Sequence, residues 1–82
     1  MQFVKGMVVR SKAGHDKGQF FVVSDIRDNY IYIIDGKYKT ALNPKKKNPL
    51  HLAPTSTVLN EQSLCTNEKI CEILDEFYER LQ

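Results

Sequence analysis

The first half of the chain alternates short hydrophobic runs with polar segments that contain glycine. The runs are rich in valine, isoleucine and aromatic residues, which favour β-strands. They occupy residues 7–9, 20–26 and 30–34. In the last run, Ile31 and Ile33 should face away from Tyr30 and Tyr32, because side chains alternate along a strand. The pattern predicts short antiparallel strands.

Turn-forming residues separate these runs. Arg27-Asp28-Asn29 predicts a turn, since Asn tolerates the left-handed conformation. Asp35-Gly36 predicts a type I′ hairpin whose return strand covers residues 37–42. A last short strand is expected at Leu50-His51-Leu52, between two prolines. The sequence therefore predicts a mainly β fold, a small barrel or sandwich of antiparallel strands.

The end of the chain has helical periodicity instead. Hydrophobic residues recur at the spacing of one helix face, at Ile70, Ile73, Leu74, Phe77 and Leu81. Thr66 or Asn67 can cap the first turn. We therefore expect a barrel over residues 1–53, a connector over 54–65, and an amphipathic α-helix over 66–82 that docks on the barrel or on a partner.

The length of 82 residues, with 41% hydrophobic residues, indicates one small domain. The longest apolar run, Tyr30 to Ile34, is too short for a spanning helix, and the N-terminus lacks the pattern of a secretory signal. Cys65 and Cys71 do not have the spacing of a metal or redox pair. We expect reduced thiols, no cofactor, no membrane partner and a cytoplasmic location.

Charge is distributed unevenly along the chain. Residues 1–53 contain ten Lys or Arg and four Asp, a net charge of +6, whereas residues 54–82 have a net charge of −4. A basic first half suits a polyanion such as nucleic acid, although surface charge can also serve solubility alone.

No catalytic motif is recognisable. The loop from Gly14 to Gly18 does not fit a phosphate-binding P-loop, because position 19 is Gln where the motif needs Ser or Thr. His15 stands beside Asp16, but no nucleophile is identifiable nearby. An enzyme is therefore not expected.

The basic segments carry the functional prediction. Three consecutive lysines stand between Pro44 and Pro49, two more flank Tyr38, and another two lie in the first loop. These lysines are Lys45, Lys46, Lys47, Lys37, Lys39, Lys12 and Lys17. Lysines can hold phosphates as point charges without reading sequence, and Tyr30, Tyr32 or Tyr38 can stack on unpaired bases.

The first half also resembles a known motif. The run Val8-Val9-x-Ser11-x-Ala13-Gly14-x-Asp16-Lys17-Gly18-x-x-Phe21-Val22-Val23 is similar to a KOW motif, in which two strands flank a polar loop with a hallmark glycine, here Gly18. Asp35-Gly36-Lys37 and Pro44-Lys45-x-Lys47-Asn48-x-x-His51-Leu52 extend the likeness to bacterial KOW-domain RNA-binding proteins related to the ribosomal L14e/L6e/L27e group. The resemblance covers roughly residues 3–53.

The resemblance implies an SH3-like barrel of about five antiparallel strands with a C-terminal α-helix, and RNA binding in a translational setting. The resemblance suggests ribosomal RNA and ribosomal proteins as partners. We expect the protein itself to be a monomer or a weak homodimer. Asp16 is a poor ligand for phosphate and is expected to brace the loop. The RNA-binding residues expected from the motif and the charges are Lys12, Gly14, His15, Lys17, Gly18, Lys37, Tyr38, Lys39, Lys45, Lys46, Lys47, Asn48 and His51.

A protein–protein adaptor is the alternative. SH3-like barrels also bind peptides, and Tyr30, Tyr32 and Tyr38 could form a peptide groove, or the acidic helix could pair with a partner.

Overall fold

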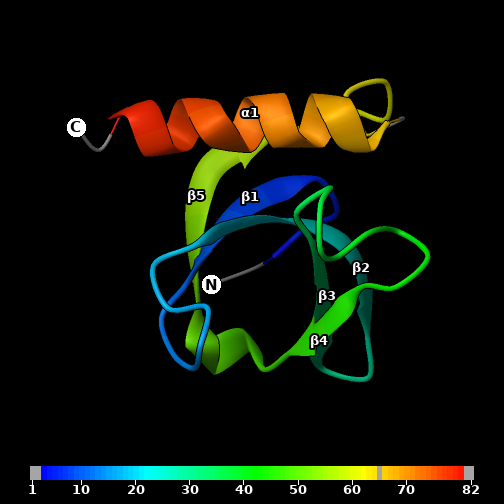
Figure 1. Cartoon of the computed structure of the whole chain (residues 1–82). Helices are drawn as coiled ribbons and strands as arrows, with labels where there is room; N and C mark the ends of the chain where they lie inside the picture. Colours follow the sequence, from blue (N-terminus) through cyan, green and yellow to red (C-terminus); the bar gives the residue numbers. More distant parts are fainter. Residues whose placement is uncertain (1–2, 65, 81–82) are drawn as a thin grey trace.

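The computed structural model describes residues 3–64 and 66–80 (Figure 1). It confirms a mainly β fold of five antiparallel strands and a C-terminal helix. The elements are β1 (Met7–Ser11), β2 (Phe20–Arg27), β3 (Tyr30–Ile34), β4 (Lys45–Lys47), a 3-10 helix (Pro49–His51), β5 (Leu52–Val58) and α1 (Asn67–Arg80). None of the helices in this part of the chain is long and apolar enough to cross a membrane.

The strands form one sheet in the order β4-β3-β2-β1-β5. The sheet curls strongly, so that its strands surround a common interior (Figure 1). Its two edges are β4 and β5, which follow each other in the chain through the 3-10 helix. The sheet is therefore open, so the term barrel overstates its closure.

Hydrophobic side chains pack on both faces of the central strands. The inner cluster contains Met7, Val9, Phe21, Val23, Ile31, Ile33 and Leu52. The outer cluster contains Val8, Phe20, Val22, Ile34, Ile70 and Leu74. Since β1 and β2 contribute alternate residues to each cluster, they are buried on both sides. Burial of Ile31 and Ile33 confirms the alternation predicted for β3.

The helix α1 docks on the sheet of its own chain. Ile70 and Leu74 are buried against the outer face of β1 and β2, and Phe77 packs beside them. The Tyr78 hydroxyl accepts a hydrogen bond of 2.8 Å from the backbone N–H of Phe20. Thr66 Oγ1 accepts from the Lys69 N–H at 3.2 Å and so caps the first turn. The helical periodicity was a correct prediction, and Cys65 and Leu81 lie outside the described residues.

The hairpin predicted at Asp35-Gly36 is wrong. Residues 37–42 form a loop, and the chain pairs again with β3 only at β4. The Asp35 carboxylate accepts the N–H groups of Lys37 and Lys39 at 2.9 and 2.8 Å, which closes a compact turn instead of starting a ladder. Gly36 has a φ of +79°, and a Cβ there would collide with the carbonyl of Asn67 at the start of α1. Helix packing, not a hairpin, therefore explains this glycine.

The turn predicted at Arg27-Asp28-Asn29 is confirmed. Asp28 and Asn29 have φ angles of 51° and 68°, so both adopt the left-handed conformation that joins β2 tightly to β3.

The last strand differs from its prediction. Leu50 and His51 belong to the 3-10 helix, and β5 runs from Leu52 to Val58 through Pro54. Edge strands tolerate proline because the N–H groups on their unpaired side make no ladder hydrogen bond, and β5 is an edge strand. The sheet thus extends into the segment expected to be a connector.

Candidate nucleic-acid interface

A buried carboxylate joins the first loop to the edge strand β4. Asp16 accepts hydrogen bonds from Ser11 Oγ at 2.6 Å, Lys45 Nζ at 2.6 Å and Lys47 Nζ at 2.7 Å. Lys47 Nζ also donates to the carbonyl of Ala13 at 3.0 Å. We call Ser11, Asp16, Lys45 and Lys47 the anchor network. It holds the β1–β2 loop against β4, which is the bracing role that the sequence predicted for Asp16.

The anchor network shifts the ionisation of its carboxyl group. Burial is the largest single influence and raises the pKa of Asp16. The hydrogen bonds from Lys45, Lys47 and Ser11, with the charge of Lys47, together outweigh it and hold the pKa well below its usual range. Asp16 is therefore ionised, and its charge is compensated inside the protein.

The three consecutive lysines are not displayed together. They form β4, where alternate side chains point to opposite faces. Lys47 is only 8% exposed, and Lys45 shares its carboxylate partner. Lys46 points outward, and its Nζ lies 4.2 Å from the centre of the Tyr30 ring. RNA contacts by these lysines stay a prediction, but two of the three ammonium groups already have an internal partner.

A basic groove lies beside the same loop. It has a volume of about 300 Å³ and is lined by Arg10, Ser11, Lys12, Lys17, Gly18 and Ala53. Three of these residues are cationic, and none of the described residues that line it is acidic. The nearest acidic residue in the loop, Asp16, faces the anchor network instead. The basic groove therefore presents uncompensated positive charge.

Backbone hydrogen bonds fix the shape of the loop at this groove. The N–H of Gly18 donates to the carbonyl of Ser11 at 2.8 Å, and the N–H of Lys12 donates to that of His51 at 2.8 Å. Gly18 has a φ of +90°, and a Cβ there would meet only Arg10 Nη2, at 3.8 Å. The turn itself therefore requires a glycine at position 18.

Arg10 is the cationic groove residue that sequence reasoning missed. It stands between Val9 and Ser11, at a position where the run that resembles a KOW motif specifies no residue. On β1 it alternates with the inner residues as Val8 does, but it is exposed. Its guanidinium is 5.9 Å from the centre of the Phe20 ring. A lone charge in an otherwise buried strand is the signal that could have identified it.

The segment Lys37-Tyr38-Lys39 lies elsewhere, in the β3–β4 loop facing α1. Lys37 and Tyr38, together with Phe20 and the helix, border a separate cavity. The lysines of the basic segments are thus divided between the basic groove with β4 and the side of the acidic helix.

The remaining predicted residues have identifiable positions. Asn48 accepts the N–H of Leu50 at 2.9 Å and caps the 3-10 helix. His15 and His51 are exposed on the surface, and Gly14 lies next to the ammonium of Lys47. Gly14 and His15 belong to the loop that borders the groove, whereas the side chain of Asn48 serves local structure.

Two comparisons with known proteins give no relative. No model of a known protein family matches the chain, and no curated protein is significantly similar to it.

Proposed function

We propose that the protein is a non-enzymatic RNA-binding module of the cytoplasm, which contacts RNA phosphates through the basic groove. The observation that carries this proposal is the convergence of Arg10, Lys12 and Lys17 on one groove with no acidic residue among its described lining. Such a surface attracts a polyanion and releases its counterions on binding.

The anchor network supports the same proposal from inside the protein. Because Lys45 and Lys47 compensate Asp16, the carboxylate of the loop does not oppose the groove cations. The two lysines bring two positive charges to one negative charge, so the network itself adds to the positive potential of this side.

The chemistry of the groove favours shape and charge over sequence. Lysine acts as a point charge on phosphate, whereas the planar guanidinium of Arg10 can hold two phosphate oxygens at once. Contacts of this kind position a nucleic acid backbone without reading its bases. The proposed ligand is therefore structured RNA, and the KOW resemblance favours ribosomal RNA in a translational setting.

Crosslinking in the native cells tests this function. The protein is crosslinked to RNA, and the recovered RNA is sequenced, with an Arg10→Gln/Lys12→Gln/Lys17→Gln variant as the control. Enrichment of ribosomal RNA that depends on the three cations is expected. Recovery of no RNA above background would overturn the proposal.

An adaptor function is the second candidate, favoured by an apolar strip. Leu50 is 79% exposed and lines a cavity of about 250 Å³ with Phe3, Pro49, Leu52 and Pro54, and with Lys12, which also lines the basic groove. The adaptor candidate therefore rests on the surface around Leu50 and not on the peptide groove expected from the tyrosines. Tyr30 and Tyr32 each lie beside a cation, whereas Tyr38 lies in the β3–β4 loop. Loss of a protein partner on Leu50→Ser, with RNA binding unchanged, would support an adaptor.

A further inference from the structure

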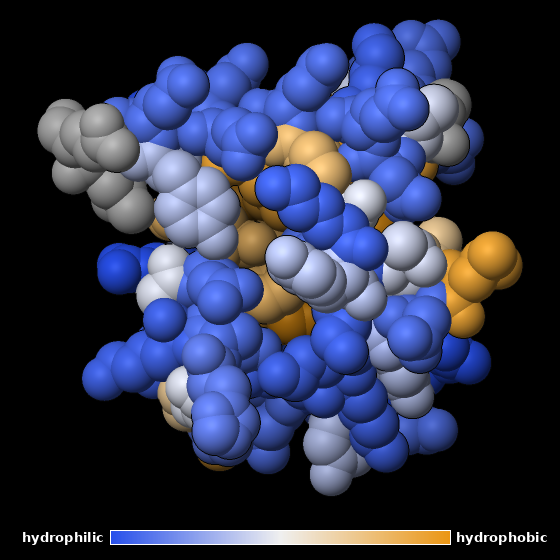
Figure 2. All heavy atoms as spheres, in the orientation of Figure 1, coloured by the Kyte–Doolittle hydropathy of each residue, from blue (hydrophilic) through white to orange (hydrophobic). Residues whose placement is uncertain are grey.

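A second cavity lies in the seam between α1 and the sheet. It has a volume of about 160 Å³ and is formed by residues 19–20, the loop after β3 and one side of α1. Figure 2 shows hydrophobic surface at this seam, surrounded by polar residues. We call it the helix pocket.

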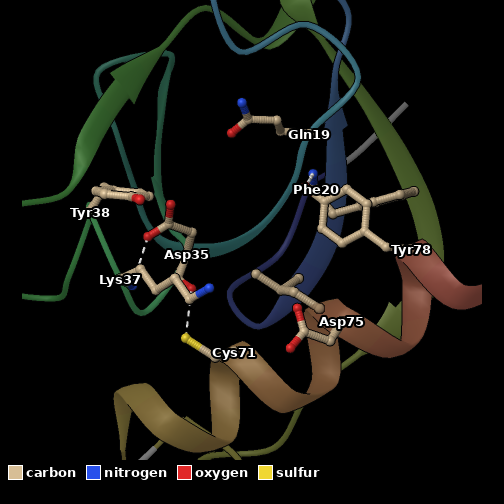
Figure 3. Close-up of a pocket in the computed structure, with 9 residues that line it drawn as sticks. Gln19, Phe20, Asp35, Lys37, Tyr38, Cys71, Asp75 and Tyr78 are labelled. Carbon is tan, nitrogen blue, oxygen red and sulfur yellow. Dashed lines mark hydrogen bonds between the residues drawn. The ribbon is translucent and has the colours of Figure 1, made fainter.

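The helix pocket combines aromatic and polar side chains. Figure 3 shows Tyr38 and Asp35 on one side of an opening, with Phe20 and Tyr78 opposite, Gln19 above and Asp75 below. Phe20 and Tyr78 meet edge to face, with ring centroids 5.2 Å apart. Tyr38 is 83% exposed, so nothing in the described chain covers its ring.

The charged groups decide what kind of ligand can enter. Asp35, Lys37 and Asp75 line the helix pocket, so its net charge is negative and a phosphate is disfavoured inside. The volume is below the roughly 300–1,000 Å³ of typical small-molecule sites. Aromatic walls with both donors and acceptors, in a space of this size, fit a single planar, hydrogen-bonding ring system.

We propose that the helix pocket holds one unpaired guanine base of the RNA whose phosphates occupy the basic groove. This inference rests on the proposed RNA-binding function and adds base preference to it. The two sites are linked by a contact: Arg10 lines the groove, and its guanidinium lies 5.9 Å from the centre of the Phe20 ring, which lines the pocket. A strand following the groove can therefore place a base in the pocket.

Guanine is the base whose edge matches the polar groups. Its Watson–Crick edge presents two adjacent N–H donors beside a carbonyl acceptor, and no other RNA base has this arrangement. A carboxylate accepts both donors, and an ammonium group donates to the carbonyl. Asp75 and Lys37 supply these groups, and Tyr38 supplies a ring on which the base stacks. The carboxylate of Asp35 is occupied on one oxygen by two backbone N–H groups, which leaves Asp75 as the reading group.

Two oligonucleotides of equal length and charge test the proposal. One is a heptamer of uridine, and the other carries a single guanosine at its centre. Affinities are measured by fluorescence anisotropy with the full chain. We expect the guanosine heptamer to bind about tenfold more tightly, the discrimination that one bidentate base contact provides. Uridine heptamers that carry a single adenosine or cytidine at the centre should bind with the same affinity as the all-uridine heptamer.

Asp75→Asn is the decisive variant, because Asp75 is exposed on α1 and its replacement is nearly isosteric. It should abolish the guanosine preference and leave the uridine affinity within about twofold. Glu76→Gln is the matched control, since it removes the same charge one residue along the helix and outside the pocket. Glu76→Gln should keep the preference.

Cys71 gives a second readout because it also lines the pocket. In a Cys65→Ser background, alkylation of Cys71 should be slowed by the guanosine heptamer more than by the uridine heptamer at equal occupancy. Equal affinities for all heptamers, or an equal effect of both helix variants, would overturn the guanine pocket and leave the RNA-binding proposal standing. Protection of Cys71 by an arginine-rich peptide but by no heptamer would assign the pocket to a protein. Absence of binding to every RNA would overturn both proposals.

Discussion

The Nζ atom of Lys47 lies 2.7 Å from the carboxylate of Asp16, although the two residues are 31 positions apart in the chain. Their side chains are 8% and 10% exposed, so this ion pair is almost entirely removed from water. Breaking such a pair leaves an uncompensated buried charge. The pair therefore determines where the β1–β2 loop lies and, with it, the shape of the basic groove.

Replacing Asp16 should destabilise the protein strongly. Asp16→Asn leaves Lys45 and Lys47 without their shared carboxylate, and we expect a loss of about 3 kcal/mol in the free energy of unfolding. Urea denaturation measures it. Asp25→Asn is the control, because Asp25 pairs with Lys5 and Arg27 at the surface and its replacement should have a much smaller effect. Similar losses in both variants would contradict the structural role of the anchor network.

Acid should remove the contribution of Asp16. Because its pKa is lowered in the folded state, it stabilises the protein above the unfolded-state pKa of about 3.9, and this stability is lost as the pH falls further. The difference in unfolding free energy between the wild type and Asp16→Asn should therefore be constant from pH 7 to about 5 and shrink below about 4. Asp25, whose pKa is also lowered, chiefly by the N–H of Ile26, is present in both proteins and cancels. A difference that does not change down to pH 2 would refute this assignment.

Two glycines with similar backbone angles should respond differently to substitution. Both Gly18→Ala and Gly36→Ala incur the cost of a left-handed residue, about 1–2 kcal/mol. At Gly36 the new methyl group also collides with the carbonyl of Asn67 and contacts Cys71 Sγ, whereas at Gly18 it makes only an ordinary contact with Arg10 Nη2. Thermal unfolding should show Gly36→Ala to be the less stable of the two. The reverse order would contradict the close packing of the β3–β4 loop on α1.

The sequence predicted those elements whose signals are local. The alternation in β3, the left-handed turn at Asp28-Asn29 and the hydrophobic face of α1 each depend on residues close together in the chain. Lysine does not favour strands, so β4 was not predictable from its own residues. In the structure, β4 pairs with β3, and Lys45 and Lys47 contact Asp16 of the distant β1–β2 loop. Gly36 was misassigned to a hairpin for a similar reason, since its requirement comes from the distant start of α1.

The candidate site was predictable only where its residues are close together in the sequence. Lys12, Lys17 and Gly18 were found from the loop motif, and the structure places all three at one groove. Arg10 joins them only through the register of β1, in which it pairs with Phe20 on one side and Ala53 on the other. Which lysines are compensated depends on contacts between distant segments, and composition does not contain this information.

The salt dependence of RNA binding tests the central claim most directly. The affinity for a structured RNA is measured at several salt concentrations for the wild type, for Arg10→Gln/Lys12→Gln/Lys17→Gln, and for a control with the same change of charge, Lys5→Gln/Lys69→Gln/Arg80→Gln. The groove variant should bind more weakly, and the slope of log affinity against log salt should be shallower by about two to three units, because each phosphate contact contributes about 0.9. The control should keep most of the wild-type slope. An unchanged slope in the groove variant, or an equal reduction in both variants, would contradict the basic groove as the RNA-binding site.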